Sequence, residues 1–527
     1  MRILITERLE QRGIEILQQE GYHVEYRPEL ARSELEGAIP VFDALIVRSA
    51  TSVDSKLIGL GVGLKVIGRA GTGVDNIDVE AATRRGIIVM NTPGGNTVSA
   101  AEHTISMMLS LARNIPQAHM SMVRGEWDRK RFVGLEVSEK TIGIIGLGKI
   151  GREVARRCLG VDMKVIGYDP VLQGDIALKL QIELVTFQEL LSRADFISVH
   201  TPLTNETRGL LNDTTIAQCK RGVRIINCAR GGIVDEKALL RGLESGQVAG
   251  AALDVFEVEP PGDQLLFRHE HVIATPHLGA STEEAQEKVA IQIARQVTDA
   301  LKGSSFVGIV NAPSRILAVQ EEIRPYLTLA ERLGSLAAQT LSGKLRSLTV
   351  IGQGELVSPS LELLKAGILK GALSHLIPDP VNLISAPLLA REMGLVFRER
   401  REPVGENFVN LLGLVVETEK EERELLGTVY GSSSVRLVRM DGYMIEVNPE
   451  GYLLIYKNID RPGMLARVGS ILAADNVNIA GVSLGRSAIG ETALTVMNID
   501  SGIGPLTLKE LRSVEGVSQV KVIRLSR

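Results

Sequence analysis

The chain has 527 residues, of which 44% are hydrophobic, 23% charged and 3% aromatic, and 59 Lys and Arg against 63 Asp and Glu give a formal net charge of −4. This length exceeds what one hydrophobic core supports, so several domains are predicted. With neither a basic excess nor many aromatic residues, the chain is not expected to bind nucleic acid.

The cysteines and the absence of long apolar runs indicate in which cellular compartment the protein is expected. Cys158, Cys219 and Cys228 show no CxxC or CxH spacing, which is typical of a reducing compartment and predicts neither a disulfide framework nor a metal site. No run of about 18 apolar residues occurs, so no membrane-spanning helix is expected. The first residues indicate a strand and an amphipathic helix, not a signal peptide. We therefore expect a cytoplasmic protein without a membrane partner.

Residues 1–310 alternate β-rich runs with helical patterns. The first runs fall at 2–6, 43–49, 64–71 and 87–93, and a helix follows from Ser99 to about Arg113, with Asn96 or Thr97 as its N-cap. A second series of runs occupies 141–151, 163–170, 195–202, 223–232, 249–257 and 271–280. Strands that alternate with helices predict two α/β units with parallel sheets. Residues 307–314 indicate a domain exit.

The C-terminal part has a different order of elements. Residues 315–447 mix helical and strand-like runs, and no motif there points to chemistry. From Gly451 the pattern is strand, helix, strand, strand, helix, strand. That βαββαβ order within one short unit predicts a ferredoxin-like fold.

A glycine-rich turn follows the apolar run at 141–145. Gly146, Gly148 and Gly151 have the spacing that lets backbone approach a pyrophosphate and a helix pack on a strand. The next strand ends in Asp169, where an acid hydrogen-bonds ribose hydroxyls and repels a 2′-phosphate. NAD is therefore predicted rather than NADP. The alternative is a structural glycine turn with Asp169 as a helix cap.

Three polar residues, Arg230, Glu259 and His277, come just after apolar strands of the second unit, where open α/β sheets bind ligands. Histidine titrates near neutrality and can take an alcohol proton while hydride leaves the carbon. A carboxylate can hold that ring, and a guanidinium can bind a substrate carboxylate in bidentate fashion. Each residue alone also has an ordinary surface explanation, so their joint placement carries the prediction.

Several strings then show a family resemblance: GRAGTGVDNID, GLGKIGREVA, HTPLT, NCARGGIVDE, ALDVFEVEPP and TPHLGAST. They are similar to the D-isomer-specific 2-hydroxyacid dehydrogenases, in particular to long-form members that act on 3-phosphoglycerate. The resemblance implies that Arg230 anchors substrate, Glu259 supports the histidine and His277 exchanges the proton. It implies NAD contacts from Thr72, Gly146, Gly148, Lys149, Ile150, Gly151, Asp169, Thr201, Cys228, Ala229, Arg230, Asp254, His277, Leu278, Gly279 and Ala280. Cys228 enters through its backbone, so its thiol is not expected to be a nucleophile.

The same resemblance implies four domains. A flavodoxin-like substrate-binding domain would comprise 1–96 plus 285–312, and a Rossmann NAD-binding domain 97–284. An α+β intervening domain would follow at 315–447 and an ACT regulatory domain at 451–527. The implied activity is oxidation of 3-phospho-D-glycerate to 3-phosphohydroxypyruvate, the first step of L-serine biosynthesis.

A phosphorylated hydroxy acid needs positive charge at both of its ends. Arg48 and Arg69 each end a strand of the first unit and would bind substrate together with Thr72, Gly73 and Arg230, the turn at 71–73 acting as a nest for the carboxylate. A further cluster, Arg129, Lys130 and Arg131, has two alternative interpretations. It is either a solvated surface turn or a part of the phosphate pocket that a neighbouring subunit contributes.

The last unit resembles an ACT domain through NIDRPGML and VNIAG. Asn458, Asp460 and Asn478 fall where such domains hold an amino acid, and L-serine is the expected effector, bound across a homo-oligomer, either a dimer or a tetramer. The alternatives are a helix-capping role for Asp460 and a turn role for Asn478. For the whole chain, the alternatives are a glyoxylate or hydroxypyruvate reductase and an NADH-responsive corepressor. Neither accounts for the long C-terminal part.

Overall fold

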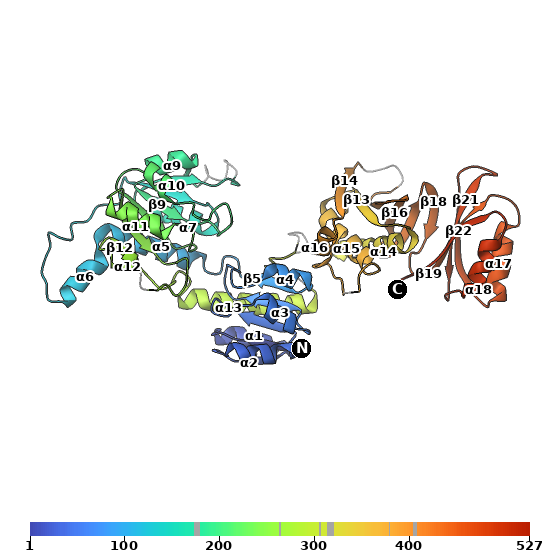
Figure 1. The fold of residues 1–527 in the computed structure, drawn as a ribbon, viewed down its shortest axis with the longest axis horizontal. Coiled ribbons are helices and arrows are strands. Elements are labelled where there is room, and N and C mark those ends of the chain that lie inside the picture. Colours follow the sequence, from blue (N-terminus) through green and yellow to red (C-terminus); the bar gives the residue numbers. More distant parts are fainter. Residues whose placement is uncertain are drawn as a thin grey trace.

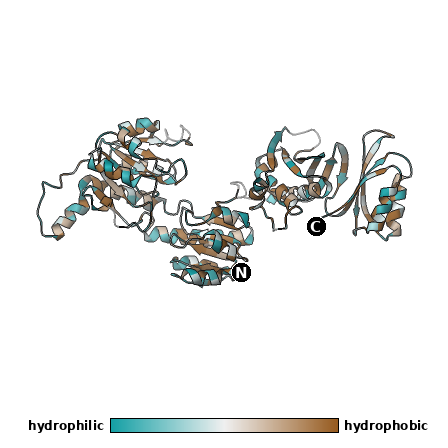
Figure 2. Ribbon diagram, viewed as in Figure 1, coloured by the Kyte–Doolittle hydropathy of each residue, from teal (hydrophilic) through white to brown (hydrophobic). Residues whose placement is uncertain are grey.

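The computed structural model describes residues 1–172, 180–262, 265–304, 307–312, 321–378, 380–403 and 408–526. These residues form four sheets, and Figure 1 shows them spread along an elongated molecule, with the two N-terminal sheets at one end and the two C-terminal sheets at the other. Figure 2 shows hydrophobic residues concentrated in the strands and inner helix faces of each unit. The predicted start of the intervening domain at 315 and the last residue of the ACT domain lie outside the described residues. No helix of the described part is both long and apolar enough to cross a membrane.

The first sheet has five parallel strands in the order β2-β1-β3-β4-β5. This is the flavodoxin-like order, as predicted. Its central strands are buried on both faces because helices cover both sides. The elements are β1 (Arg2–Ile5), α1 (Gln11–Gln19), β2 (His23–Tyr26), α2 (Arg32–Ala38), η1 (Ile39–Val41), β3 (Ala44–Val47), α3 (Ser55–Leu60), β4 (Val66–Arg69), α4 (Val79–Arg84) and β5 (Ile88–Asn91).

The second sheet has seven parallel strands in the order β12-β11-β10-β9-β6-β7-β8, the Rossmann order. The order reverses at β6, between β7 and β9. The elements are α5 (Thr97–Arg113), α6 (Ile115–Val123), β6 (Thr141–Ile145), α7 (Lys149–Leu159), β7 (Lys164–Tyr168), β8 (Glu183–Leu184), α9 (Phe187–Arg193), β9 (Phe196–Val199), α10 (Asp213–Gln218), β10 (Val223–Asn227), α11 (Glu236–Glu244), β11 (Val248–Leu253), α12 (Leu265–Arg268) and β12 (Val272–Ala274).

Helix α13 (Glu283–Lys302) returns from the second sheet to the first. A Cβ on Gly68 of β4 would lie 2.8 Å from Val297, and one on Gly13 of α1 would lie 2.8 Å from the Ala290 carbonyl oxygen. These glycines therefore let α13 pack closely against both elements. The chain thus crosses between the two sheets twice, at 92–97 and before α13.

The third sheet is mixed, in the order β14-β13-β15-β16-β17-β18, with β13 and β14 parallel and the other pairs antiparallel. Helices α14 and α15 pack so closely that a Cβ on Gly334 would lie 2.0 Å from the Ile368 carbonyl oxygen. The elements are η3 (Glu321–Ile323), α14 (Arg324–Thr340), β13 (Leu345–Gln353), η4 (Ser358–Ser360), α15 (Leu361–Leu373), α16 (Ala386–Glu392), β14 (Val396–Glu402), β15 (Leu411–Thr418), β16 (Glu422–Tyr430), β17 (Ser434–Met440) and β18 (Tyr443–Val447).

The last unit is an antiparallel sheet in the order β20-β21-β19-β22, with α17 and α18 packed on it. Its elements are β19 (Gly451–Ile459), α17 (Met464–Ala474), β20 (Ile479–Arg486), β21 (Thr492–Ile499), α18 (Pro505–Ser513) and β22 (Val517–Leu525). The predicted ferredoxin-like order is confirmed.

Candidate active site

The predicted glycine-rich turn joins β6 to α7 at the point where the strand order of the second sheet reverses. Gly146 has φ +92°, and a Cβ there would lie 2.7 Å from the His200 carbonyl oxygen. A Cβ on Gly151 would lie 2.0 Å from the Gly146 carbonyl oxygen. Side chains are therefore excluded from the turn, and the backbone amides at the start of α7 stay open to an anion.

Asp169 follows β7 and holds this turn in shape. Its Oδ2 accepts a hydrogen bond from the Leu147 amide (2.8 Å), and its Oδ1 accepts from the amides of Val171 and Leu172 (2.9 and 3.1 Å). The contacts to the amides of Val171 and Leu172, two and three residues further on, are of the kind that a capping Asp makes, so Asp169 also serves the structural role that the alternative describes. Thr201, also predicted to contact NAD, has a buried Oγ1 without a hydrogen-bond partner among the described residues. An open amide cradle and an orphaned hydroxyl both fit a bound dinucleotide.

Asp254 is fully buried just after β11 and organises the loop that follows β12. It accepts hydrogen bonds from the Thr275 hydroxyl (2.6 Å) and from the amides of Leu278 and Gly279 (2.7 and 2.8 Å). His103 Nε2 of α5 lies 3.1 Å from Asp254 Oδ1. Burial alone would raise the pKa of Asp254, but the hydrogen bonds from His103 and Thr275 outweigh it and lower that pKa. The sequence analysis did not single out His103 or Thr275.

The carboxyl ends of three adjacent strands, β10, β11 and β12, bring the predicted catalytic residues to one edge of the second sheet. His277 Nδ1 lies 2.7 Å from Glu259 Oε2, and Glu259 Oε1 accepts a hydrogen bond from the Phe256 amide (3.1 Å). Since the carboxylate can only accept, Nδ1 carries the proton and donates it, which leaves Nε2 of the ring to face a substrate. Both side chains are part-exposed, 41% for His277 and 37% for Glu259.

Arg230 reaches from the second sheet to the first. Its Nε donates to Asp75 Oδ2 (2.8 Å) and its Nη1 to the Ala229 carbonyl (2.7 Å). A Cβ on Gly73 would lie 2.1 Å from Arg230 Nη2. The guanidinium therefore lies directly against the turn at 71–73, as a residue between the two α/β units should.

Arg69 meets the same turn from the other side. It ends β4, its Nε donates to Asn76 Oδ1 (3.2 Å), and a Cβ on Gly71 would lie 2.3 Å from its Nη1. Burial, followed by the charge of Arg230, lowers the pKa of Arg69 to about 10. This group remains charged at neutral pH, and both guanidinium groups lie against the same turn, Arg69 at Gly71 and Arg230 at Gly73.

Arg48 follows β3, which neighbours β4 in the sheet. Its carbonyl accepts from Asn76 Nδ2 (2.8 Å), and its amide donates to Glu7 Oε1 (2.8 Å). Asn76 thus joins the backbone of Arg48 to the side chain of Arg69. The described residues provide no carboxylate partner for the Arg48 guanidinium, whose Nη1 donates to the Arg8 carbonyl (3.3 Å).

Thr72 and Cys228 complete the predicted contacts of the cleft. Thr72 Oγ1 donates to Asn96 Oδ1 (2.7 Å), so Asn96 precedes α5 without capping it by its side chain. Burial, with the charge of Asp254, raises the pKa of the Cys228 thiol to about 12. At neutral pH this thiol is protonated and unreactive, in agreement with a backbone role.

The basic cluster at 129–131 lies elsewhere in the chain. It belongs to a segment after α6 that projects from the second unit, on the side away from the first sheet (Figure 1). The amides of Lys130 and Arg131 donate to Asp128 Oδ1, and Arg131 Nη2 lies 3.5 Å from Glu270 Oε2. Within one chain the cluster does not join Arg48 and Arg69.

The three predicted effector residues do not meet within one ACT-like unit. Asn458 is buried and exchanges hydrogen bonds with Thr495 and the Ile459 carbonyl, and Asp460 Oδ2 lies 3.4 Å from Arg486 Nη1. Asn478 donates to Asp500 (2.8 Å) just before β20. Strand register puts the start of β20 level with the start of β19, about 20 Å along the sheet from Asn458. The helix-cap alternative for Asp460 is wrong, since Gly463 is the residue before α17 and no side chain caps that helix.

Comparison with known proteins follows the same domain order. The model of the D-isomer specific 2-hydroxyacid dehydrogenase NAD binding domain matches residues 105–279, that of the D-3-phosphoglycerate dehydrogenase intervening domain matches 322–441, and that of the ACT domain matches 452–516. A D-3-phosphoglycerate dehydrogenase of Archaeoglobus fulgidus is 40% identical over 528 residues, with both chains covered completely. The D-3-phosphoglycerate dehydrogenase of Homo sapiens is 43% identical and covers 95% of each chain. A solved structure, the NAD-dependent formate dehydrogenase of Staphylococcus aureus in complex with NAD, is 30% identical with a TM-score of 0.54, over 60% of this chain and 100% of that one.

Proposed function

Because the chain belongs to the family of D-3-phosphoglycerate dehydrogenases, we propose that Arg230, Glu259 and His277 carry out its reaction between the two α/β units. The enzyme oxidises 3-phospho-D-glycerate to 3-phosphohydroxypyruvate, the first step of L-serine biosynthesis, and its cofactor is NAD. The observation that supports the residue assignment is the 2.7 Å pair of His277 Nδ1 and Glu259 Oε2 beside the end of the strand that leads to Arg230.

His277 and Glu259 together carry out the proton transfer. His277 Nε2 takes the proton of the C2 hydroxyl, and Glu259 stabilises the resulting imidazolium through Nδ1. Bound NAD would supply the acceptor for the hydride that leaves C2. Arg230 holds the substrate carboxylate and, in the reverse direction, polarises the carbonyl that Nε2 protonates. Gly146, Gly148 and Gly151 leave the cradle free for the cofactor phosphates, and Asp169 keeps the turn in register for them.

Arg48 and Arg69 supply the charge that a phosphorylated substrate needs. They lie at the ends of adjacent strands and share Asn76 as a hydrogen-bonding partner. Arg48→Gln is expected to reduce kcat/KM for 3-phosphoglycerate at least tenfold and to leave the weak turnover of D-glycerate nearly unchanged. Arg512→Gln, an exposed arginine of α18 in the last unit, is the matched control. Reduced nicotinamide is measured with an enzyme that consumes the product, or in the reverse direction. An equal loss with both substrates would assign Arg48 a structural role.

A homo-oligomer is supported by one exposed apolar stretch. On α6 and the segment after it, Met122, Val123, Trp127 and Val133 are 54%, 65%, 75% and 78% exposed. Such a patch on a projecting segment is typical of a subunit interface, and a second copy would also bring the cluster at 129–131 to another chain's site. Trp127→Glu is expected to lower the mass measured by light scattering, whereas an unchanged mass would refute this interface.

L-serine regulation is proposed on the ACT-like unit. Because Asp460 and Asn478 lie at opposite ends of the sheet, one serine could contact both only if two units pair antiparallel. Asn478→Ala should abolish inhibition by serine and keep basal turnover, while Asn476→Ala, two residues earlier in the turn, should preserve inhibition. Inhibition that survives Asn478→Ala would refute the assignment.

The cytoplasmic location stays a prediction, which cell fractionation would check.

A further inference from the structure

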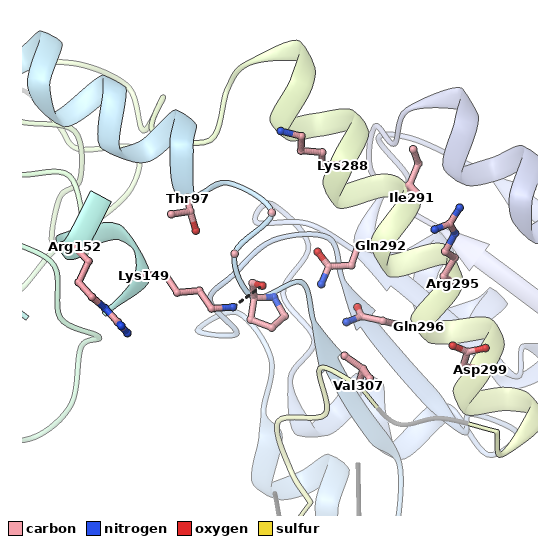
Figure 3. Close-up of a pocket in the computed structure, with 13 residues that line it drawn as sticks. Thr97, Lys149, Arg152, Lys288, Ile291, Gln292, Arg295, Gln296, Asp299 and Val307 are labelled. Atoms are coloured by element: carbon pink, nitrogen blue, oxygen red, sulfur yellow. Dashed lines mark hydrogen bonds between the residues drawn. The ribbon is translucent and has the colours of Figure 1, made fainter. Parts of the chain in front are cut away.

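A basic hollow of about 900 Å³ lies beside the first crossing between the two α/β units. Figure 3 shows its two walls: Lys149 and Arg152 on α7, and Lys288 and Arg295 on α13, with the turn at Pro93–Gly95 between them. The volume is within the range of small-molecule sites. The walls therefore come from elements on both sides of the crossing.

The charge of this hollow is unbalanced. Four cations line it against one carboxylate, Asp299, which leaves a net charge of +3. Lys149 Nζ donates to the Pro93 carbonyl (3.2 Å) and Arg152 Nε to the Gly148 carbonyl (3.3 Å). None of the four makes an ion pair within the described parts of the chain. Uncompensated cations from separate elements favour a multiply charged anion.

The polar floor of the hollow also lacks partners. Gln296 is 5% exposed, and neither its Nε2 nor its Oε1 has a hydrogen-bond partner among the described residues. Thr92, next to Pro93, is fully buried with an unpartnered Oγ1. Buried polar groups are normally hydrogen-bonded, so two orphans beside one basic hollow indicate a ligand or ordered water.

The side chains of α13 that line the hollow lie on one face of that helix. Lys288, Gln292 and Arg295 are at positions i, i+4 and i+7, and Figure 3 shows them along one face of the helix beside the hollow. Gln296 and Asp299 extend this face. On the α13 wall a ligand would touch two cations and two amides, whereas Lys149 on the α7 wall is also among the residues predicted to bind NAD.

We propose that this hollow binds a small polyphosphate-type anion, held jointly by α7 and α13. The two cations of each wall neutralise it, and the amides of Gln292 and Gln296 donate to its oxygens. Because α7 belongs to the second sheet and α13 packs on the first, the bound anion links the two α/β units across the crossing. The site is separate from the pair of Glu259 and His277 and does not depend on their roles.

The test uses the full chain and inorganic tripolyphosphate as the probe, measured by titration calorimetry first without and then with saturating NADH. One tripolyphosphate per chain is expected to bind. The double variant Lys288→Gln/Arg295→Gln should bind at least tenfold more weakly, and Lys509→Gln, an exposed lysine of α18, should bind as the parent does. Both α13 residues are exposed and glutamine is a good helix former, so circular dichroism should show an intact fold, and Arg295→Lys should retain most of the affinity.

The proposal would be overturned by no binding of tripolyphosphate, by unchanged binding in the double variant, or by complete displacement of the probe by NADH. The last would assign Lys149 and Arg152 to the cofactor phosphates and leave α13 without a ligand. Loss of binding in Lys509→Gln would equally refute it, because the attraction would then be a property of the total charge.

Discussion

Glu259→Gln keeps the shape of the pair with His277 but removes its negative charge. The two groups are hydrogen-bonded at 2.7 Å, and during oxidation the ring gains a positive charge. Two unit charges about 4 Å apart interact by about 4 kcal/mol at an effective dielectric of about 20 and by about 1 kcal/mol in water. Because both side chains are more than a third exposed, screening places the loss near the lower value, about 1–2 kcal/mol. We therefore expect kcat to fall about 5- to 30-fold.

The assay separates this charge effect from a loss of packing. The stabilised charge develops in the transition state, so kcat should fall while KM for 3-phosphoglycerate stays nearly constant. Glu257→Gln, an exposed neighbour two residues earlier, is the matched control. A change in KM alone would refute the role of Glu259 as the charge partner.

Three further predictions concern buried positions. Asp254→Asn should cost about 2 kcal/mol of unfolding free energy, because the single oxygen of an amide cannot accept from both backbone amides that the carboxylate now holds. Since the pKa of Asp254 is lowered in the fold, the stability that its carboxylate contributes should vanish as the pH falls below about 4. Denaturant titrations of parent and variant at several pH values would show this loss. Cys228→Ser should leave turnover within about twofold, and iodoacetamide should not inactivate the parent at neutral pH, because the pKa of this thiol is about 12. Gly151→Ala would bring a methyl group 2.0 Å from the Gly146 carbonyl oxygen. The free energy of unfolding should therefore fall by about 1–3 kcal/mol, seen as a lower melting temperature, and the NADH affinity measured by fluorescence should fall as well.

The sequence predicted the strands that carry apolar runs but missed two edge strands. β2 (His23–Tyr26) and β8 (Glu183–Leu184) are short and partly exposed, so neither has the apolar run of a buried strand. Both lie at sheet edges, where only one neighbour constrains them. The parallel character of both sheets could be anticipated because their strands alternate with helices, whereas their strand orders were implied only by the family resemblance.

The residues of the candidate active site could also be predicted only in part from the sequence. Glu259 and His277 could be predicted because each follows an apolar strand, and adjacent parallel strands end at the same edge. His103 lies in the middle of α5, and its contact with Asp254 depends on how that helix packs against the sheet. No spacing in the sequence indicates such a contact. The sequence also did not indicate that Asp460 and Asn478 lie far apart. Only the strand register shows that they lie at opposite ends of the ACT-like sheet.

The contact between the first and third units is physically connected to Arg48 and Arg69, the arginines proposed to bind substrate. Arg84 Nη2 lies 2.7 Å from Glu392 Oε1 of α16, and Asn382 Nδ2 donates to the Gly86 carbonyl (2.8 Å). Both contacts hold the end of α4, the helix that begins three residues after Asn76, which itself binds the side chain of Arg69. Exposed ion pairs of this kind contribute about 0–1 kcal/mol, so the joint positions the third unit without fixing it rigidly. A displacement of α16 would therefore act on the loop that holds Arg48 and Arg69, the arginines proposed to bind substrate, and only indirectly on the pair of Glu259 and His277 in the second sheet.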